Sequence, residues 1–181
     1  MIANRQRSAS YLAIALLTIT TVLMVYTGNQ WRLNGGLTLG IVTFSLGIFF
    51  VIAASAVFLA YRKMAEFATW LLLAAQSGLF ILVTVLVSDI APLLAIAELF
   101  TVALFALLSL RPGRPAGALI AVGVFIGLAL LTIDFAFDTV GTWPRLAPDA
   151  TLTRYLLPGL LIGLTVFGAG LLFTRMRESS L

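Results

Sequence analysis

Glu98 is the residue with the clearest capacity for chemistry in this 181-residue chain, because it is a charged side chain well inside a long apolar segment. Segment 90–110 is otherwise polar only at the hydroxyls of Thr101 and Ser109. A carboxylate in hydrocarbon costs about 3 kcal/mol on insertion scales, so it requires a proton, a partner or water. Glu98 is therefore either a neutral, hydrogen-bonded acid that holds helices together, or a carboxyl that handles protons or cations in a transport machine.

The amide of Gln76 is a candidate partner for Glu98. The apolar runs that contain these two residues are separated by a very short turn near Asp89, so they must lie side by side as antiparallel helices. With a rise of about 1.5 Å per residue, the depths of Gln76 and Glu98 differ by roughly 6 Å. A direct contact is possible on this spacing, and a contact through one bridging water is more comfortable.

Asp134 and Asp138 form a second acidic pair, four residues apart near the end of the fifth apolar run. This spacing places both on one helix face, where two like charges are unfavourable unless they are paired or hydrated. Arg145 and Arg154 follow in the next loop and are the candidate partners. The pair is either a solvated helix end or an entrance that gathers cations on the outer side.

The chain contains neither cysteine nor histidine. Disulfides, thiol nucleophiles, histidine–metal clusters and bis-histidine haem sites are therefore excluded, together with Ser–His–Asp and Cys–His catalysis. The sequence also has no glycine-rich phosphate loop and no pairing of a nucleophile with a base. We therefore expect neither an enzyme nor a bound cofactor or metal.

The composition predicts an all-α, polytopic integral membrane protein that forms a single membrane domain over residues 1–181. Hydrophobic residues make up 61% and charged residues 10% of the chain, with a mean hydropathy of +1.12. A helix needs about 20 apolar residues to cross a bilayer. Six runs meet this length: 9–26, 37–61, 67–87, 90–110, 116–137 and 155–173. Pro92 and Pro158 are expected in the opening turns of the fourth and sixth helices, and 27–36 is expected to be a loop.

The basic residues predict the topology. One set of connections and ends carries eight: Arg5, Arg7, Arg62, Lys63, Arg111, Arg114, Arg175 and Arg177. The other set carries three: Arg32, Arg145 and Arg154. The positive-inside rule then places both termini in the cytoplasm of a multi-pass protein of the cell inner (plasma) membrane. The net charge of +4 indicates attraction to the lipid bilayer rather than to nucleic acid. The first run is expected to stay as a helix, since no clear signal cleavage site follows it.

Small residues recur at four-residue spacing, a pattern that lets membrane helices approach closely. Three pairs have it: Gly36 with Gly40, Gly123 with Gly127, and Gly159 with Gly163. They predict either a tightly packed bundle or faces that dock other membrane subunits.

Two stretches resemble a known family. Residues 97–108 read AELFTVALFALL, preceded by AQSGL at 75–79, and residues 133–141 read IDFAFDTVG. Over residues 60–141 the chain resembles a small membrane module of multisubunit sodium/proton antiporters and membrane-bound hydrogenases, related to a five-helix subunit of respiratory complex I. Glu98 falls on the family's single glutamate. The chain departs from the pattern at Ala136 and Thr142, where the family usually has Arg and Glu, and helix 9–26 is an addition without a counterpart.

The resemblance implies a non-catalytic subunit of a proton- or cation-translocating complex, with other membrane subunits as partners. Glu98, Gln76, Asp134 and Asp138 would then contribute to a hydrated ion path, with Glu98 largely protonated at rest. The alternative is a scaffold or sensor membrane protein without transport, in which Glu98 only joins helices and the glycine faces bind a partner.

Overall fold

The apolar runs form α-helices in the computed structural model, which describes residues 2–108, 114–140, 145–147 and 150–179. The described part contains six: α1 (Ile2–Asn34), α2 (Leu37–Tyr61), α3 (Ala65–Leu86), α4 (Ala91–Leu108), α5 (Arg114–Val140) and α6 (Leu157–Ser179). All six are long and apolar enough to cross a membrane. The predicted all-α architecture with six helices of membrane-spanning length is confirmed, and no named strand occurs in these residues.

The first connection is much shorter than predicted. Residues 27–34 continue α1 instead of forming a loop, and the Asn34 side-chain amide donates a hydrogen bond of 2.8 Å to Gln30 Oε1 one turn earlier. The turn to α2 consists of Gly35 and Gly36, with φ of 69° and 97°. Glycine adopts such positive φ angles at little cost, so these two residues can reverse the chain direction between α1 and α2.

The start of the sixth helix also differs from prediction. Pro158 lies in the first turn of α6, as predicted, but a π-helical turn, η1 (Leu152–Leu156), runs directly into α6, so the helical stretch begins before the proline. The Leu157 N–H bonds to Leu152 O, five residues back. Proline lacks an N–H and its ring crowds the preceding turn. The π turn lies directly before Pro158, in the segment where the proline interrupts the regular α-helical hydrogen bonding.

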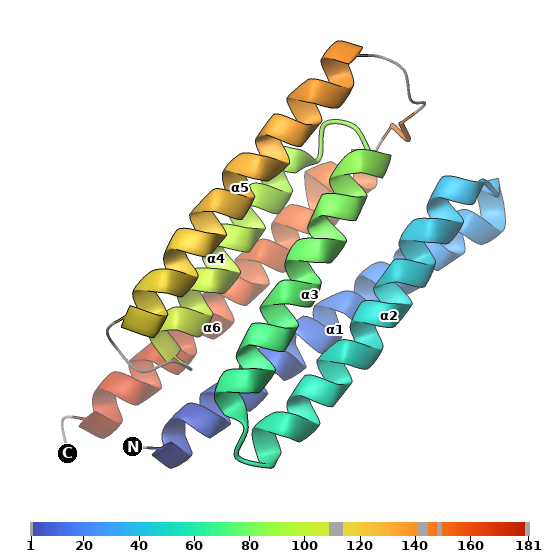
Figure 1. The fold of residues 1–181 in the computed structure, drawn as a ribbon. Helices are drawn as coiled ribbons and strands as arrows, with labels where there is room; N and C mark the ends of the chain where they lie inside the picture. The colour runs from blue at the N-terminus through green and yellow to red at the C-terminus, as the bar shows by residue number, and fades with distance from the viewer. Residues whose placement is uncertain (1, 109–113, 141–144, 148–149, 180–181) are drawn as a thin grey trace.

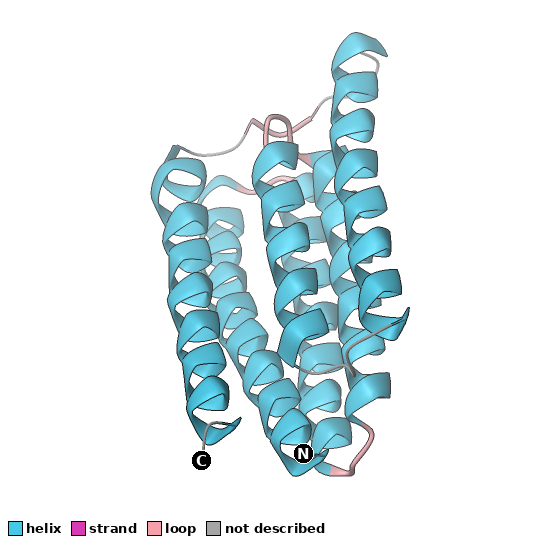
Figure 2. Ribbon diagram, turned by 90° about the vertical axis from the view of Figure 1, so that its left-hand side faces the viewer, coloured by secondary structure: helices cyan, strands magenta, loops and turns pink. Residues whose placement is uncertain are grey.

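The helices run up and down in one bundle, and the chain enters and leaves at the same end (Figures 1 and 2). The most extensive contacts join α1 with α2, α2 with α3, and α4 with α5. Helix α3 also contacts α4 and α5, which connects the two halves of the bundle. Helix α6 contacts α4 and α1 and is the most exposed of the spans.

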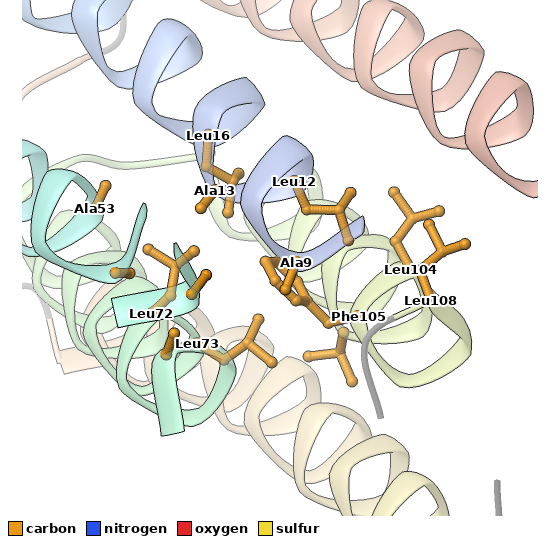
Figure 3. Close-up of a cluster of buried hydrophobic side chains, with 14 of the residues drawn as sticks. Ala9, Leu12, Ala13, Leu16, Ala53, Leu72, Leu73, Leu104, Phe105 and Leu108 are labelled. Atoms are coloured by element: carbon orange, nitrogen blue, oxygen red, sulfur yellow. The ribbon is translucent and has the colours of Figure 1, made fainter. Parts of the chain in front are cut away.

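Two apolar clusters form the core, one towards each end of the bundle. At the end that holds the termini, Leu12 and Leu16 of α1 pack with Leu72 of α3 and Phe105 of α4 (Figure 3). Helix α1 is therefore part of this core. At the opposite end, a second cluster includes Ile90 and residues of α2 to α5. The middle of α4, where Glu98 lies, falls between the two clusters.

Large apolar side chains cover the outside of the bundle. Phe44 of α2, Phe125 and Phe135 of α5 and Phe173 of α6 are each at least 70% exposed. A soluble monomer rarely presents contiguous apolar surface on this scale, whereas hydrocarbon solvates it without cost. The exposed surface therefore agrees with a protein embedded in lipid.

Candidate functional site

Glu98 lies at the centre of a buried polar cluster between α3 and α4. Its side chain is completely inaccessible, and Gln76 is 2% exposed. The Gln76 Nε2 donates a hydrogen bond of 2.9 Å to Glu98 Oε2. The predicted proximity of these two residues is confirmed, and the contact is direct without a bridging water.

Ser77 is a third member of the cluster and is not among the site residues predicted from the sequence. Its hydroxyl lies 2.6 Å from Glu98 Oε1. Successive residues on a helix point about 100° apart, so Gln76 and Ser77 reach the carboxyl from different directions. A carboxyl group offers one oxygen to each of them. The signal that could have identified Ser77 is its position beside Gln76, on a helix known to adjoin α4.

The Ser77 hydroxyl can bond to either of two oxygens. Besides Glu98 Oε1, it lies 2.9 Å from Leu73 O, one turn earlier on α3. A hydroxyl has one hydrogen to donate and two lone pairs that accept. If Glu98 is ionised, Ser77 donates to its carboxylate. If Glu98 is protonated on Oε1, it donates to Ser77, and Ser77 donates to Leu73 O.

Both protonation states of Glu98 are therefore satisfied by the same positions of the heavy atoms. The change between them needs one proton on the carboxyl and the rotation of one hydroxyl hydrogen. Gln76 donates to Oε2 in either state. No lysine or arginine of the described residues forms an ion pair with Glu98. The cluster is suited to gaining and losing a proton with little reorganisation.

Arg145 forms the centre of a second polar cluster, at the end of the bundle opposite the termini. Its guanidinium pairs with Asp134 and, at 2.6 Å, with Asp138. The same group donates hydrogen bonds of 2.6 Å to Thr84 O and 2.7 Å to Val87 O at the end of α3. The Arg145 side chain is only 5% exposed. We call this set of five residues the Arg145 clamp.

The backbone next to Arg145 reinforces the clamp. Leu146 forms an isolated parallel bridge with Val87, in which Leu146 N donates to Leu86 O and Ser88 N donates to Leu146 O. Arg145 and Leu146 are thereby held against the turn between α3 and α4. Arg154, the other predicted partner of the acidic pair, lies exposed in η1 and takes no part in the two ion pairs of the described residues.

The structure separates the carboxyls proposed for one ion path into two sites. Gln76 and Glu98 are together in the middle of the bundle, whereas Asp134 and Asp138 share a cation at its end. Asp134 is 14% and Asp138 50% exposed at the side chain. Pairing with Arg145 explains how two like charges share a helix face. A role of this pair as a cation entrance stays a prediction.

Gly123 and Gly127 are internal packing positions between α5 and α4. A methyl group added at Gly123 would lie 2.8 Å from Val102 Cγ1, and one added at Gly127 would lie 3.6 Å from Leu99 Cγ. Gly168 of α6, which the sequence analysis did not single out, is similarly close to Leu104. These glycines let α5 and α6 approach α4, as small residues do in membrane bundles.

The other two glycine pairs differ from this pattern. Gly36 lies in the hairpin turn with open space around it, so the structure assigns it a turn in place of the predicted helix contact. Gly40 packs against the ring of Trp31. Gly159 and Gly163 have open space at their Cα atoms and line a shallow groove of about 340 Å³ between α1 and α6.

Comparison of the chain with family models, curated proteins and solved structures finds no match.

Proposed function

We propose that this chain is a non-catalytic membrane subunit of a proton- or cation-translocating complex, in which Glu98 carries a proton. The observation that supports this most is the contact set of Glu98. A carboxyl in the middle of a membrane bundle has hydrogen-bond partners for both its neutral and its ionised form, and no ion-paired cation fixes it in one form. Intramembrane carboxyls commonly mark proton relays.

The resemblance of residues 60–141 to the antiporter and hydrogenase module agrees with this role, since Glu98 occupies the position of the family glutamate. Gln76 would orient the carboxyl, and Asp134 and Asp138 would lie where the path meets the outer surface. A complete pump requires more ionisable groups inside the membrane than this chain supplies. The other ionisable groups needed for translocation would therefore lie in other subunits of the complex.

Partner subunits are expected on the groove lined by Gly159 and Gly163. Helix α6 is the least buried span, and these two glycines leave room for another helix to approach. Gentle extraction from native membranes followed by mass spectrometry tests this expectation. Co-purification of antiporter- or hydrogenase-like subunits would support the proposal, whereas a chain that migrates alone would contradict it.

The decisive test is ion transport by the assembled complex after substitution of Glu98. Glu98→Asp should retain part of the activity, because a carboxyl remains. Glu98→Gln and Glu98→Ala should lose most of it while the complex still assembles, because neither side chain titrates. Normal transport by Glu98→Gln would show that the residue only joins helices.

That last outcome would favour the alternative function, a scaffold or sensor membrane protein. Ser77→Ala is a useful companion variant. It removes the hydroxyl that exchanges its hydrogen bond but leaves the carboxyl and Gln76 in place. Slower transport with normal assembly would point to the hydroxyl as part of the proton exchange.

The orientation proposed for the bundle places both termini and the α2–α3 turn in the cytoplasm. The chain has no cysteine, so single cysteines report without background. Lys63→Cys should resist an impermeant thiol reagent in intact cells, and Ala147→Cys, exposed at the opposite end, should react. Labelling at position 63 from outside would reverse the topology.

A further inference from the structure

The turn between α2 and α3 carries two adjacent cations at the end of the bundle that holds the termini (Figure 1). Arg62 and Lys63 are both exposed there. Neither forms an ion pair with a carboxylate whose side chain the structure describes, including that of Glu66, the nearest acid along the chain. The turn therefore presents two positive charges that these carboxylates do not neutralise.

Contacts within the hairpin fix where the two cations lie. Lys63 adopts a φ of 68°, and its N–H closes the turn with a hydrogen bond of 3.3 Å to Ala60 O. The Arg62 guanidinium lies over the ring of Phe58, 5.1 Å from the ring centre, which is the geometry of a cation–π contact. Phe58 precedes Arg62 by one helical turn and is 58% exposed. The guanidinium is therefore held against the apolar surface of α2.

Exposed aromatic side chains near the turn indicate its depth in the membrane. Tyr61 is 68%, Phe67 55% and Trp70 39% exposed. Tyrosine and tryptophan gather where the hydrocarbon meets the lipid headgroups. This composition places Arg62 and Lys63 at the level of the lipid phosphates.

A groove of about 220 Å³ lies between α2 and α3, further along the same hairpin. Gly78 borders it and has no other atom within 4 Å of the position of a Cβ, so the groove is open beside α3. The hydroxyl of Ser45, which also lines it, donates to Ile41 O within α2 at 2.8 Å. The other lining side chains are hydrocarbon: Ile48, Phe49, Ile52, Ala75, Leu79 and Leu82. The groove suits an alkyl chain better than a polar ligand.

The groove and the turn lie on the same face of α2. Spacings of three and four residues connect one with the other: Ile48, Ile52, Ser55, Leu59 and Arg62. Ile52 lies ten residues before Arg62, which corresponds to about 15 Å along the helix. One leaflet of the hydrocarbon core is also about 15 Å deep, half of the full thickness of about 30 Å. A lipid with its phosphate at the turn therefore reaches the groove with the end of an acyl chain.

We propose that this face of the α2–α3 hairpin binds an anionic glycerophospholipid, such as phosphatidylglycerol. Its phosphate would pair with Arg62 and Lys63, and the end of one acyl chain would enter the groove. Charge complementarity selects the headgroup, because the two cations attract a lipid of net negative charge and repel the choline of a zwitterionic one. The site lies away from Glu98 and does not rest on the proposed function.

The volume of the groove favours an acyl chain over a protein helix as the occupant. One turn of a helix with its side chains, about 10–12 Å across and 5.4 Å long, fills roughly 500 Å³. The groove has less than half of this volume. A methylene chain is much thinner and can enter from the side that faces lipid. A helix of a partner or of a second copy could lie across the groove but would not fill it.

The test uses phosphatidylglycerol and phosphatidylcholine probes that have the same acyl chains and carry a photoreactive diazirine near the end of one chain. Each probe is added at the same low fraction to phosphatidylcholine nanodiscs that hold the purified protein. After illumination, labelled residues are mapped by mass spectrometry and normalised to Phe125, which is exposed on α5. The phosphatidylglycerol probe should label Ile48, Ile52 and Leu82 about tenfold more than the phosphatidylcholine probe, the ratio that one to two basic residues provide.

One pair of variants tests the headgroup. Arg62→Gln/Lys63→Gln should reduce the ratio between the two probes to about one, because the charges that select the headgroup are gone. Arg32→Gln/Arg154→Gln removes the same charge from two exposed arginines elsewhere and should keep the ratio. Thermal unfolding of each variant verifies that the bundle is intact.

A second pair tests the acyl chain. Gly78→Phe fills the groove and should abolish groove labelling by both probes. Gly163→Phe places the same side chain at another glycine with open space around it, between α1 and α6, and should leave groove labelling unchanged. The two pairs thus examine the two ends of the lipid separately.

Four results would overturn the proposal. Equal groove labelling by both probes in the native protein would show that the site does not select an anionic headgroup. An unchanged ratio in folded Arg62→Gln/Lys63→Gln would show that the turn is not the headgroup site. Unchanged labelling in folded Gly78→Phe would show that the chain does not enter the groove. A groove that neither probe labels would leave this face to a partner helix or a second copy of the chain.

Discussion

The Glu98 cluster and the Arg145 clamp both stabilise carboxyl groups in or near hydrocarbon, but they do so with different kinds of partner. Asp134 and Asp138 share a guanidinium that also binds two backbone carbonyls. Glu98 is more deeply buried, and its hydrogen-bond partners are a serine and a glutamine. A cation holds a carboxylate in its ionised form, whereas neutral partners accept either form. The difference separates carboxylates fixed by a cation from a carboxyl that has hydrogen-bond partners for both of its protonation states.

The clamp further connects segments that are far apart in the chain. Arg145 bonds to carbonyls about 60 positions earlier, at the end of α3, and to acids at the end of α5. The Glu98 cluster involves only the adjacent helices α3 and α4. Loss of charge should therefore destabilise the bundle at the clamp and leave it nearly unchanged at Glu98.

The largest effect is expected for Arg145→Met. The substitution retains most of the apolar stem but leaves Asp134 without a cation and two carbonyls without a donor. Removing one partner of a buried ion pair costs about 3–5 kcal/mol. Thermal or denaturant unfolding in detergent measures the loss. Arg154→Met, which alters an exposed arginine in η1, is the matched control and should change stability by less than about 0.5 kcal/mol.

The two acids of the clamp should contribute unequally. Asp134→Asn should lower the free energy of unfolding by about 1–3 kcal/mol, because this side chain is mostly buried and its bond to Arg145 is charge-assisted. Asp138→Asn should cost about 0.2–1 kcal/mol, because Asp138 is half-exposed and solvent screens its interaction. Unfolding measured at low and high salt checks the difference. An equal loss of unfolding free energy in both variants would mean that burial does not determine how much each carboxylate contributes to stability.

The smallest effect is expected for Glu98→Gln, which should change the free energy of unfolding by less than about 1 kcal/mol. The amide can keep a hydrogen bond with each of Gln76 and Ser77, and no cation loses its partner. Glu98→Leu should cost about 1–3 kcal/mol, because the buried Gln76 amide then has no acceptor. The same unfolding assay compares them. A loss of several kcal/mol in Glu98→Gln would indicate that the folded protein depends on the carboxylate charge and that the two sites do not differ as described.

The glycines show how far spacing alone can be interpreted. The same four-residue spacing occurs in all three pairs, yet the neighbourhoods differ. Gly123 packs against Val102, Gly36 forms a turn, and Gly159 has open space around it. The spacing predicts that small residues share a helix face. Which face meets another helix depends on how the helices are arranged around the bundle.

The amino-acid sequence by itself determined the six apolar helices and placed Gln76 within possible reach of Glu98. Hydrophobic length sets where helices cross a bilayer, and a short turn forces neighbouring helices together. Arg145 could be identified as a candidate for the acidic pair, but not as the residue that binds α3 as well. The role of Ser77, the π turn before Pro158 and the bonds of Arg145 to α3 were decided only by the tertiary structure. They depend on the rotation of each helix about its axis and on contacts between distant segments, which local spacing does not specify.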